Sequence, residues 1–315
     1  MSVNVTTGSN GVNPLNELIT KFVLGATTIE RGLMRVIPNQ QNIVEISKFR
    51  TDADKLTALE CTPSTPNDSM HKDFLQIATG GCQFYDTFCP EEDFFEDWSF
   101  LWATGRMTDS QAAPKIKGAI QETVIGSVQA NLEKLIWTGD VDAVAMTWLD
   151  RFDGYVKILE ADATVRDVTN IGIITVENIF QVLSDTKNAS NAEMLERGNG
   201  TFLVSYKDLQ KLYDAQGSAD ISKGVNVMDK GVAAYAGYKV VSCGIPENMV
   251  LFTNASSGSD SNLLGATWML ADTKGVKIER LQANSSEWFS LVKFRFGVNI
   301  MYGDDCAFYQ GVVIP

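Results

Sequence analysis

The longest regular pattern of apolar and polar residues lies near the C-terminal end of the chain. From Trp288 to Tyr302 the even-numbered positions read Trp, Ser, Val, Phe, Phe, Val, Ile, Tyr, whereas the odd-numbered positions include Lys293, Arg295 and Asn299. A period of two predicts a β-strand with one buried face. At about 3.3 Å per residue this strand would span roughly 50 Å, about three times the usual length.

A second long pattern has helical spacing. Apolar residues recur every three or four positions at Ile116, Ile120, Val124, Val128, Leu132, Leu135 and Ile136. Asp109 or Ser110 can cap this helix, Pro114 lies near its start, and Gly139 follows its end. About 24 residues at 1.5 Å each give roughly 36 Å. Because the stripe is one-sided, the other face is left for solvent or for a neighbouring molecule.

Two β-rich runs, residues 41–50 and 73–89, predict a long hairpin. The polar segment between them carries two prolines and is long for a connection within a compact domain. We therefore expect an arm that reaches another subunit. Residues 1–12 are polar and Gly/Asn-rich, which predicts a flexible arm, and Asn13-Pro14 reads as the start of a helix.

Pro90 and the three acids after it read as the start of a further helix. Its apolar stripe contains Phe94, Trp98 and Trp102, which fit a core or an interface better than a ligand pocket. Residues 140–285 then alternate between strands and helices and predict an α+β lobe.

Several elements of this lobe can be placed by their sequence. We expect strands in GYVKILEA and TFLVS, and two strands around a Pro turn in VAAYAGYKVVSCGIPENMVLFTN. A loop at ASSGSDSN and the segments GATWMLAD and KGVKIERL complete the lobe. We expect helices in VENIFQVLSDTKN, capped by Thr175, and in YKDLQKLYDA, capped by Ser205.

Composition narrows the class of protein. The chain has 315 residues, 44% of them apolar and 21% charged, which is typical of one large globular domain or two lobes. A net charge of -13 disfavours a nucleic-acid-binding face. We expect no signal peptide and no membrane span, and the sequence lacks phosphate-loop, dinucleotide-binding and zinc-protease motifs.

One short motif points to chemistry. The residues Tyr302-Gly303-Asp304-Asp305 match the turn that holds two metal ions in RNA-copying polymerases. Only ten residues follow Asp305, and the acidic net charge does not suit a template channel. The alternative is that both acids are solvated turn residues between two strands.

The cysteines and the sole histidine do not form a metal site by spacing. The cysteines are scattered at Cys61, Cys82, Cys89, Cys243 and Cys306. Such an odd set suits buried, reduced thiols better than a disulfide framework. His71 lies in a polar segment, so we expect no metal, no cofactor and no catalytic residue.

The order of these elements resembles the major capsid protein of tailed bacteriophages, the Hong Kong 97-type fold. The best local similarities are GYKVVSCGIPENMVLFTN, NLLGATW and the alternating VKFRFGVNI. The resemblance implies an α+β chain with a long spine helix at about 112–138. It divides the sequence into an N-terminal arm (1–38), an extended β-arm or E-loop (39–89), a peripheral domain (90–145 plus 280–315) and an axial domain (146–279).

The resemblance also implies a function. The chain would self-assemble into hexamers and pentamers of an icosahedral shell around double-stranded DNA, in a virion assembled in the bacterial cytoplasm. Its partners would be many copies of itself, a separate scaffolding protein, a portal and a decoration protein, without sequence-specific DNA binding, a membrane or enzymatic activity. Two alternatives stay open: an encapsulin-type compartment, and an acidic metal-dependent enzyme that uses Asp304 and Asp305.

Residues expected at contacts between subunits follow from the same resemblance. They are Lys48, Phe49, Lys55 and Lys72 in the β-arm, the aromatic residues Phe94, Trp98 and Trp102, and the strand residues Lys293 and Arg295. Some relatives crosslink a β-arm lysine to an asparagine of a neighbour, and here Lys48, Lys55 or Lys72 and Asn299 lie in the corresponding regions.

Overall fold

The structure is a computed structural model that describes residues 26–38, 43–51, 70–88, 109–143, 148–218, 228–229, 232–268, 277–282 and 287–311. The chain divides into two compact units. Unit 1 comprises residues 1–26, 83–132 and 269–294, and unit 2 comprises residues 27–82, 133–268 and 295–315. The four regions implied by the resemblance describe roles in an assembly and stay a prediction.

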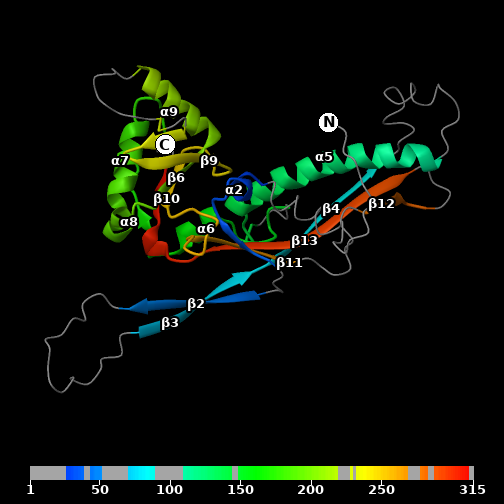
Figure 1. Cartoon of the computed structure of the whole chain (residues 1–315), viewed down its shortest axis with the longest axis horizontal. Coiled ribbons are helices and arrows are strands. Elements are labelled where there is room, and N and C mark those ends of the chain that lie inside the picture. Colours follow the sequence, from blue (N-terminus) through cyan, green and yellow to red (C-terminus); the bar gives the residue numbers. More distant parts are fainter. Residues whose placement is uncertain are drawn as a thin grey trace. The chain divides into compact units, whose positions relative to one another are not determined.

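The predicted long strand is present as β13 (Trp288–Ile300; Figure 1). Its 13 residues extend about 43 Å at 3.3 Å per residue. All even-numbered positions from Ser290 to Ile300 are buried, as the alternation predicted. Gly297 on the other face is buried as well. The backbone of Ala78 packs directly on it, since a Cβ atom at position 297 would lie 2.2 Å from the carbonyl oxygen of Ala78.

The predicted long helix is α5 (Asp109–Thr138), whose 30 residues extend about 45 Å. Its stripe is confirmed where side chains are described, since Val124, Val128 and Leu132 are each at most 5% exposed. The helix ends before Gly139, where a side chain would lie 2.2 Å from the carbonyl oxygen of Phe152. Close packing of the backbone therefore requires this glycine.

Unit 1 contains the first part of β13. Strand β12 (Lys277–Arg280) pairs antiparallel with it, with Lys277 opposite Leu291. Strand β4 (Gly80–Phe88) also pairs with β13. The ring of Tyr85 stacks on that of Phe289 with centroids 6.1 Å apart.

Unit 2 contains a seven-stranded sheet in the described part of the chain. Its strands, in spatial order, are β5 (Arg166–Asp167), β14 (Ala307–Gln310), β10 (Met249–Thr253), β6 (Thr201–Ser205), β9 (Tyr238–Cys243), β8 (Val232–Tyr235) and β7 (Met228–Asp229). Strands β6 and β9 pair in parallel, whereas β10 pairs antiparallel with both β6 and β14. Every residue of β6 is buried, so this strand lies at the centre of the lobe.

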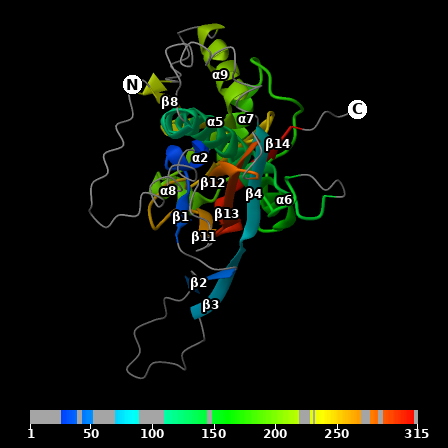
Figure 2. The same ribbon diagram turned by 90° about the vertical axis from the view of Figure 1, so that its right-hand side faces the viewer.

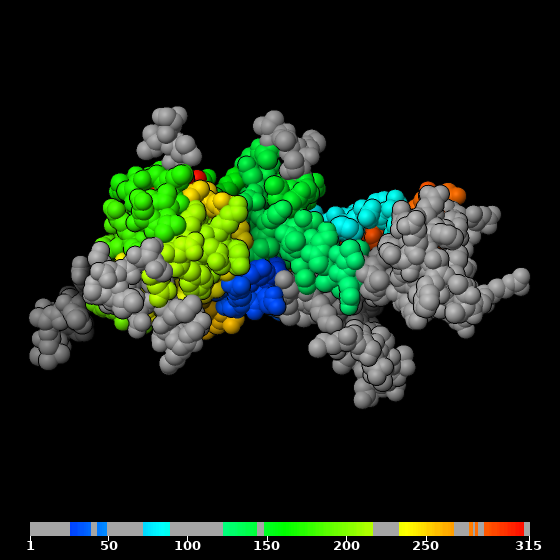
Figure 3. All heavy atoms as spheres, turned by 90° about the horizontal axis from the view of Figure 1, so that it is seen from above, coloured from blue at the N-terminus to red at the C-terminus, as the bar shows by residue number. Residues whose placement is uncertain are grey.

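Helices α7 (Ile179–Ala189) and α9 (Tyr206–Ser218) pack on this sheet and on each other (Figures 1 and 2). They share one apolar core with the strands, built around Phe202, Val250 and Phe252. The short helix α8 (Ala192–Arg197) follows α7, and its N-cap residue Asn191 accepts a hydrogen bond from the Glu193 amide. Figure 3 shows green and yellow-green atoms of this lobe beside yellow to orange atoms from the segment that contains β9 and β10.

Two predictions in this lobe are wrong. GYVKILEA forms helix α6 (Tyr155–Ala161) rather than a strand. The buried Tyr155 and Leu159 lie four residues apart, which is helical spacing that so short a run does not distinguish from a strand. The segment 232–254 holds three strands rather than two, because Ala236 and Gly237 both have positive φ and make a tight hairpin turn between β8 and β9.

The rest of unit 2 consists of short N-terminal elements, a strand and a hairpin. Helix α2 (Thr27–Glu30) precedes β1 (Arg35–Ile37), which pairs in parallel with β11 (Leu263–Trp268). Strand β11 pairs antiparallel with the second part of β13. The predicted hairpin is present as β2 (Ile43–Thr51) and β3 (Met70–Ala78), with Ile43 opposite Ala78 and Thr51 opposite Met70. The rest of the second predicted run does not belong to the hairpin, because it forms β4, which pairs with β13.

Some predictions lie outside the described residues. These are the N-terminal flexible arm, the helix starting at Asn13-Pro14, the hairpin tip and the helix opened by Pro90. Within the described residues, no helix combines the length and apolar character that crossing a membrane requires.

Candidate functional site

The Gly-Asp-Asp turn is the short 3-10 helix η2 (Gly303–Asp305), which connects β13 to β14. A side chain at Gly303 would lie 2.2 Å from Thr164 Oγ1 and 2.3 Å from Asp162 Oδ2, so the turn packs closely against the segment before β5. Asn191 Nδ2 donates a hydrogen bond to Asp305 Oδ1 at 3.4 Å. The motif thus connects two strands, as the structural alternative predicted, but both acids are half-buried rather than solvated, and Asp305 is bonded to the start of α8.

Burial acts on the ionisation of this turn. Removal from water raises the pKa of Asp305 above its usual value, and the neighbouring Asp304 carboxylate adds to the effect. Among the described residues, no three His, Cys, Asp or Glu side chains are grouped so that they could hold a metal ion.

We expect Asp305→Asn to raise the melting temperature at neutral pH. Because the pKa is higher in the folded state than in the unfolded state, the fold favours the protonated Asp305 carboxyl. The stabilisation by the protonated form is present in full below the unfolded-state pKa. It is lost as the pH rises through the folded-state pKa. The asparagine side chain keeps an acceptor oxygen for Asn191, and the substitution removes the half-buried charge of Asp305. The gain should be under about 4 °C and should shrink as the pH is lowered in thermal scans. A lower melting temperature at neutral pH would contradict this account of the turn.

The described cysteines are inert thiols. Burial raises the pKa of Cys82 and that of Cys306 to about 12, and it raises the pKa of Cys243 well above its usual value. A thiol reacts as the thiolate, so none of the three is activated at neutral pH. All three are free and buried or half-buried, which confirms the prediction for them. Cys61 and Cys89 lie outside the described residues.

The two faces of the β2–β3 hairpin differ in what they contact. On one face Val44 and Ile77 are buried and pack on Leu264 and Ala266 of β11. The opposite face is exposed, although it carries Ile43 at 59% and Phe74 at 58% exposure. An amphipathic ribbon normally exposes polar side chains, so this second face is a candidate contact surface.

The predicted contact residues of the hairpin are placed as follows. Lys48 lies on the face that packs within unit 2, with its Nζ 5.4 Å from the centre of the Tyr302 ring, and burial lowers its pKa. Lys72 is exposed on the face of Phe74, with its Nζ 4.9 Å from that ring. Phe49 lies opposite Lys72 in the register.

The other predicted contact residues are scattered. Lys293 and Arg295 are half-buried on the odd-numbered face of β13. Asn299 Nδ2 donates to the carbonyl oxygen of Gln76 at 2.8 Å, so it is held within its own chain. Lys55, Phe94, Trp98 and Trp102 lie outside the described residues. The structure therefore gathers Phe49 and Lys72 on one ribbon, and their role at subunit contacts stays a prediction.

A buried clasp joins the N-terminal segment to the end of α5. Glu133 is 8% exposed and accepts hydrogen bonds from Thr28 N at 2.9 Å, Thr28 Oγ1 at 2.5 Å and Gly244 N at 2.7 Å. Trp137, one turn further along α5, donates from Nε1 to the same Thr28 hydroxyl at 2.9 Å. These contacts fix α2 and the β9–β10 connection to the last turn of the helix.

A surface that the sequence analysis missed is the loop of residues 170–176 (NIGIITV), which we call the isoleucine loop. It exposes Ile171 at 38%, Ile173 at 46% and Val176 at 37%, whereas Ile174 is buried. Four of its seven residues are Ile or Val, which by themselves indicate burial, so their exposure was not expected. The helix predicted from Thr175 begins only at Ile179, so the loop is longer than expected.

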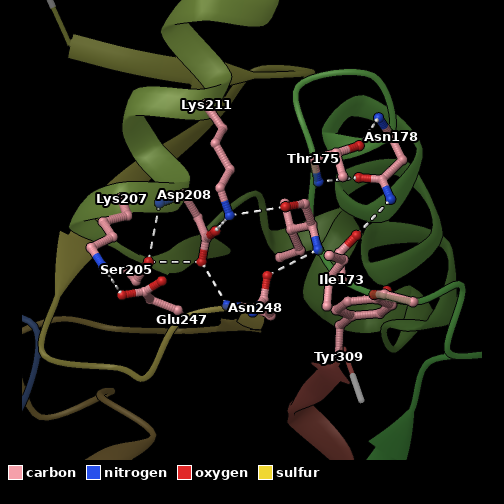
Figure 4. A network of polar contacts seen from close by, with 12 residues as sticks. Ile173, Thr175, Asn178, Ser205, Lys207, Asp208, Lys211, Glu247, Asn248 and Tyr309 are labelled. Atoms are coloured by element: carbon pink, nitrogen blue, oxygen red, sulfur yellow. Dashed lines mark hydrogen bonds and ion pairs between the residues drawn. The ribbon is translucent and has the colours of Figure 1, made fainter. Parts of the chain in front are cut away.

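Hydrogen bonds connect the backbone of the isoleucine loop to neighbouring elements (Figure 4). The Ile174 amide donates to Asn248 Oδ1 at 3.0 Å, and the Ile174 carbonyl accepts from Lys211 Nζ at 2.9 Å. The Gly172 carbonyl accepts from the Tyr309 hydroxyl at 2.5 Å, and the Ile173 carbonyl accepts from Asn178 Nδ2 at 2.9 Å. The loop is thus bonded to β14, to α9 and to the residue before β10.

Asp208 is the centre of this network. Its carboxylate is fully buried and accepts from Ser205 Oγ at 2.7 Å, Asn248 N at 2.9 Å and Lys211 Nζ at 2.7 Å. Its amide donates to Ser205 Oγ at 3.1 Å, which confirms the predicted cap of α9. Lys207 and Glu247 form an ion pair beside it (Figure 4).

Comparisons with known proteins gave matches in structure only. No family model and no curated protein match the sequence. The chain is similar to the satellite phage P4 procapsid that includes the size determination (Sid) protein, with a TM-score of 0.60 and 11% identity over 98% of this chain and 93% of that chain.

Two further structures match at a similar level. The capsid of the native GTA particle gives a TM-score of 0.56 and 14% identity, over 99% of this chain and 96% of that chain. The cyanophage A-1(L) capsid gives a TM-score of 0.54 and 12% identity, over 99% of this chain and 96% of that chain. The chain therefore has, over nearly its whole length, the α+β fold of phage capsid proteins, the Hong Kong 97-type fold that its order of elements resembles.

Proposed function

We propose that this chain is the major capsid protein of a tailed bacteriophage and that it assembles into hexamers and pentamers of an icosahedral shell around double-stranded DNA. The observation that carries the proposal is the reciprocal match to capsid chains, which leaves little of either chain uncovered.

The arrangement of the elements supports this role. The strand β13 has 13 residues, the helix α5 has 30, and the β2–β3 hairpin has nine paired positions, so all three are long elements. Extended elements of this kind supply area for contacts with neighbouring copies. The acidic net charge of -13 is compatible with a shell that encloses DNA without gripping it.

We further propose that the chain is not an enzyme. The Gly-Asp-Asp turn is explained by packing, since Gly303 fits against Asp162 and Asp305 is bonded to Asn191. The proposed partners are other copies, a separate scaffolding protein, a portal and a decoration protein. The proposed place of assembly is the bacterial cytoplasm, and the final location is the virion.

The exposed face of the hairpin should be needed for assembly. We expect Phe74→Asp to lower the yield of assembled particles at least about tenfold, the effect of 1.4 kcal/mol per contact. Phe74 is 58% exposed, so the folded subunit should keep its melting temperature. The measurement is the area of the particle peak in size-exclusion chromatography.

Asn188→Asp is the matched control, because Asn188 is exposed on α7 and the change adds the same charge. The control should assemble like the unmodified chain. Equal particle yields for Phe74→Asp and the control would show that the exposed hairpin face is not needed for assembly.

The proposed function is tested by size-exclusion chromatography with light scattering, followed by negative-stain microscopy. Closed shells, or rings of five and six copies, are expected, with a scaffolding protein added if the chain alone does not close. Nuclease-protected DNA in particles from infected cells would support the phage shell, and a protein cargo would favour the encapsulin-type alternative. A monomer that binds Mn²⁺, and loses it in the Asp304→Ala and Asp305→Ala double variant, would overturn the proposal.

A further inference from the structure

The isoleucine loop combines two properties that rarely occur together. It exposes three aliphatic side chains within seven residues, and its backbone is held by hydrogen bonds from Asn248, Lys211 and Tyr309. A loop that exposes apolar residues to water for no purpose has no need of such support. Rigid loops bind with less loss of conformational entropy, which is an advantage for a contact surface.

The backbone of the loop is specialised as well. Gly172 has a φ of 102°, which side-chain-bearing residues rarely adopt, so the chain bends between Ile171 and Ile173. Asn248, which holds the loop, also has a positive φ of 64°. A side chain at Gly311 would lie 2.6 Å from the Gly172 carbonyl oxygen, so the end of β14 packs directly on the bend.

Charge indicates what the loop contacts. The chain carries a net charge of -13, so two copies repel each other wherever acidic surfaces meet. Residues 170–176 contain no ionisable side chain. The two nearby cations are already matched, because Lys211 binds Asp208 and Lys207 pairs with Glu247. A neutral, apolar surface on a strongly acidic chain is suited to contact with another copy of that chain.

We propose that the isoleucine loop is a docking surface for a second copy of this chain. The contact is head-to-tail, so the loop of each copy meets a different surface of the next and the contacts close into a ring. This inference rests on the proposed shell function and specifies which surface of the unit 2 lobe joins neighbouring copies. Three aliphatic side chains supply part of a standard interface, whose size is about 800 Å² per partner.

The first test is photocrosslinking. The reactive amino acid p-benzoylphenylalanine is placed at position 173 and, as a matched control, at position 181, because Gln181 is exposed on α7. Irradiation of the assembled protein should give a ladder of crosslinked copies from position 173 and little from position 181. Shells that form normally but give no ladder from position 173 would overturn the inference while leaving the proposed function intact.

The second test is a substitution. Ile173→Asp should lower the yield of particles at least about tenfold, while Gln181→Asp, which adds the same charge, assembles normally. The melting temperatures of both variants should stay within about 4 °C of the unmodified chain. Normal assembly of Ile173→Asp would also overturn the inference.

The two proposals fail differently. Crosslinked small oligomers from position 173 in a protein that never forms shells or capsomers would overturn the proposed function and keep the docking surface. A protein that forms no shell and gives no crosslinks would overturn both.

Discussion

Replacing Asp208 with alanine is expected to lower the free energy of unfolding by about 3–5 kcal/mol. The carboxylate is fully buried and is the shared acceptor for Ser205, Asn248 and Lys211. Its loss leaves the Asn248 amide without its acceptor and the Lys211 ammonium without its carboxylate partner, with only the Ile174 carbonyl as acceptor. Removing one member of a buried charged pair has a far larger effect than removing an exposed pair. Urea unfolding followed by circular dichroism measures the difference.

Two variants separate the parts of this effect. Asp208→Asn keeps the size of the side chain and an acceptor oxygen, so its loss of stability should be smaller than that of Asp208→Ala. Lys211→Met leaves Asp208 with its two uncharged donors, Ser205 and Asn248. The free energy of unfolding of this variant should lie between that of the unmodified chain and that of Asp208→Ala. A loss of less than about 1 kcal/mol in the free energy of unfolding for Asp208→Ala would show that the network does not stabilise the lobe as a unit.

Trp137→Ala should lower the free energy of unfolding by a similar amount, about 3–5 kcal/mol. The indole is fully buried, lies 5.3 Å from the Tyr155 ring by centroids and donates to Thr28 Oγ1. The substitution opens a cavity at the end of α5 and removes one bond of the Thr28–Glu133 clasp. Circular dichroism is the appropriate probe, because the change removes a tryptophan from the fluorescence signal.

Trp137→Phe is the matched variant for this site. It keeps most of the ring and removes the hydrogen bond to Thr28, so about 1–2 kcal/mol should be lost. An equal loss for the phenylalanine and alanine variants would mean that the hydrogen bond, rather than the packing, dominates. A loss near zero for both would contradict the clasp as a structural element.

The long elements could be predicted because their patterns repeat many times. The strand β13 has six buried even-numbered positions from Ser290 to Ile300. A shift by one residue would have placed all of these side chains on the opposite face, so the pattern specifies which face is buried. The helix α5 repeats its stripe over several turns in the same way. Ser205 was identifiable as a cap, since it stands between a buried strand and an amphipathic helix and is followed three residues later by Asp208.

The short elements could not be predicted by the same reasoning. Helix α6 has seven residues, too few for a period to emerge, and part of its position is fixed by ion pairs from Lys157 to Asp140, Asp142 and Asp153. The β8–β9 turn has Ala236 where Asn or Asp is usual, so the sequence showed no turn. Such elements are determined by contacts between distant residues.

The candidate surfaces were predictable only in part. The hairpin that carries Phe49 and Lys72 was predicted from its two β-rich runs, whereas these two residues were chosen by the resemblance and their contact role stays a prediction. The isoleucine loop was not predicted, because apolar residues alone indicate burial. Its exposure depends on the bonds from Asn248 and Tyr309, which lie more than 70 residues further along the chain.

A cryo-electron microscopy reconstruction of the assembled protein tests the central claim most directly. The expected result is a closed icosahedral shell made of rings of five and six subunits. The structure of this chain should fit the density of every subunit, with the isoleucine loop of one copy in contact with its neighbour. A purified protein that stays a monomer, with and without a scaffolding protein, or that assembles into open filaments rather than closed shells, would contradict it.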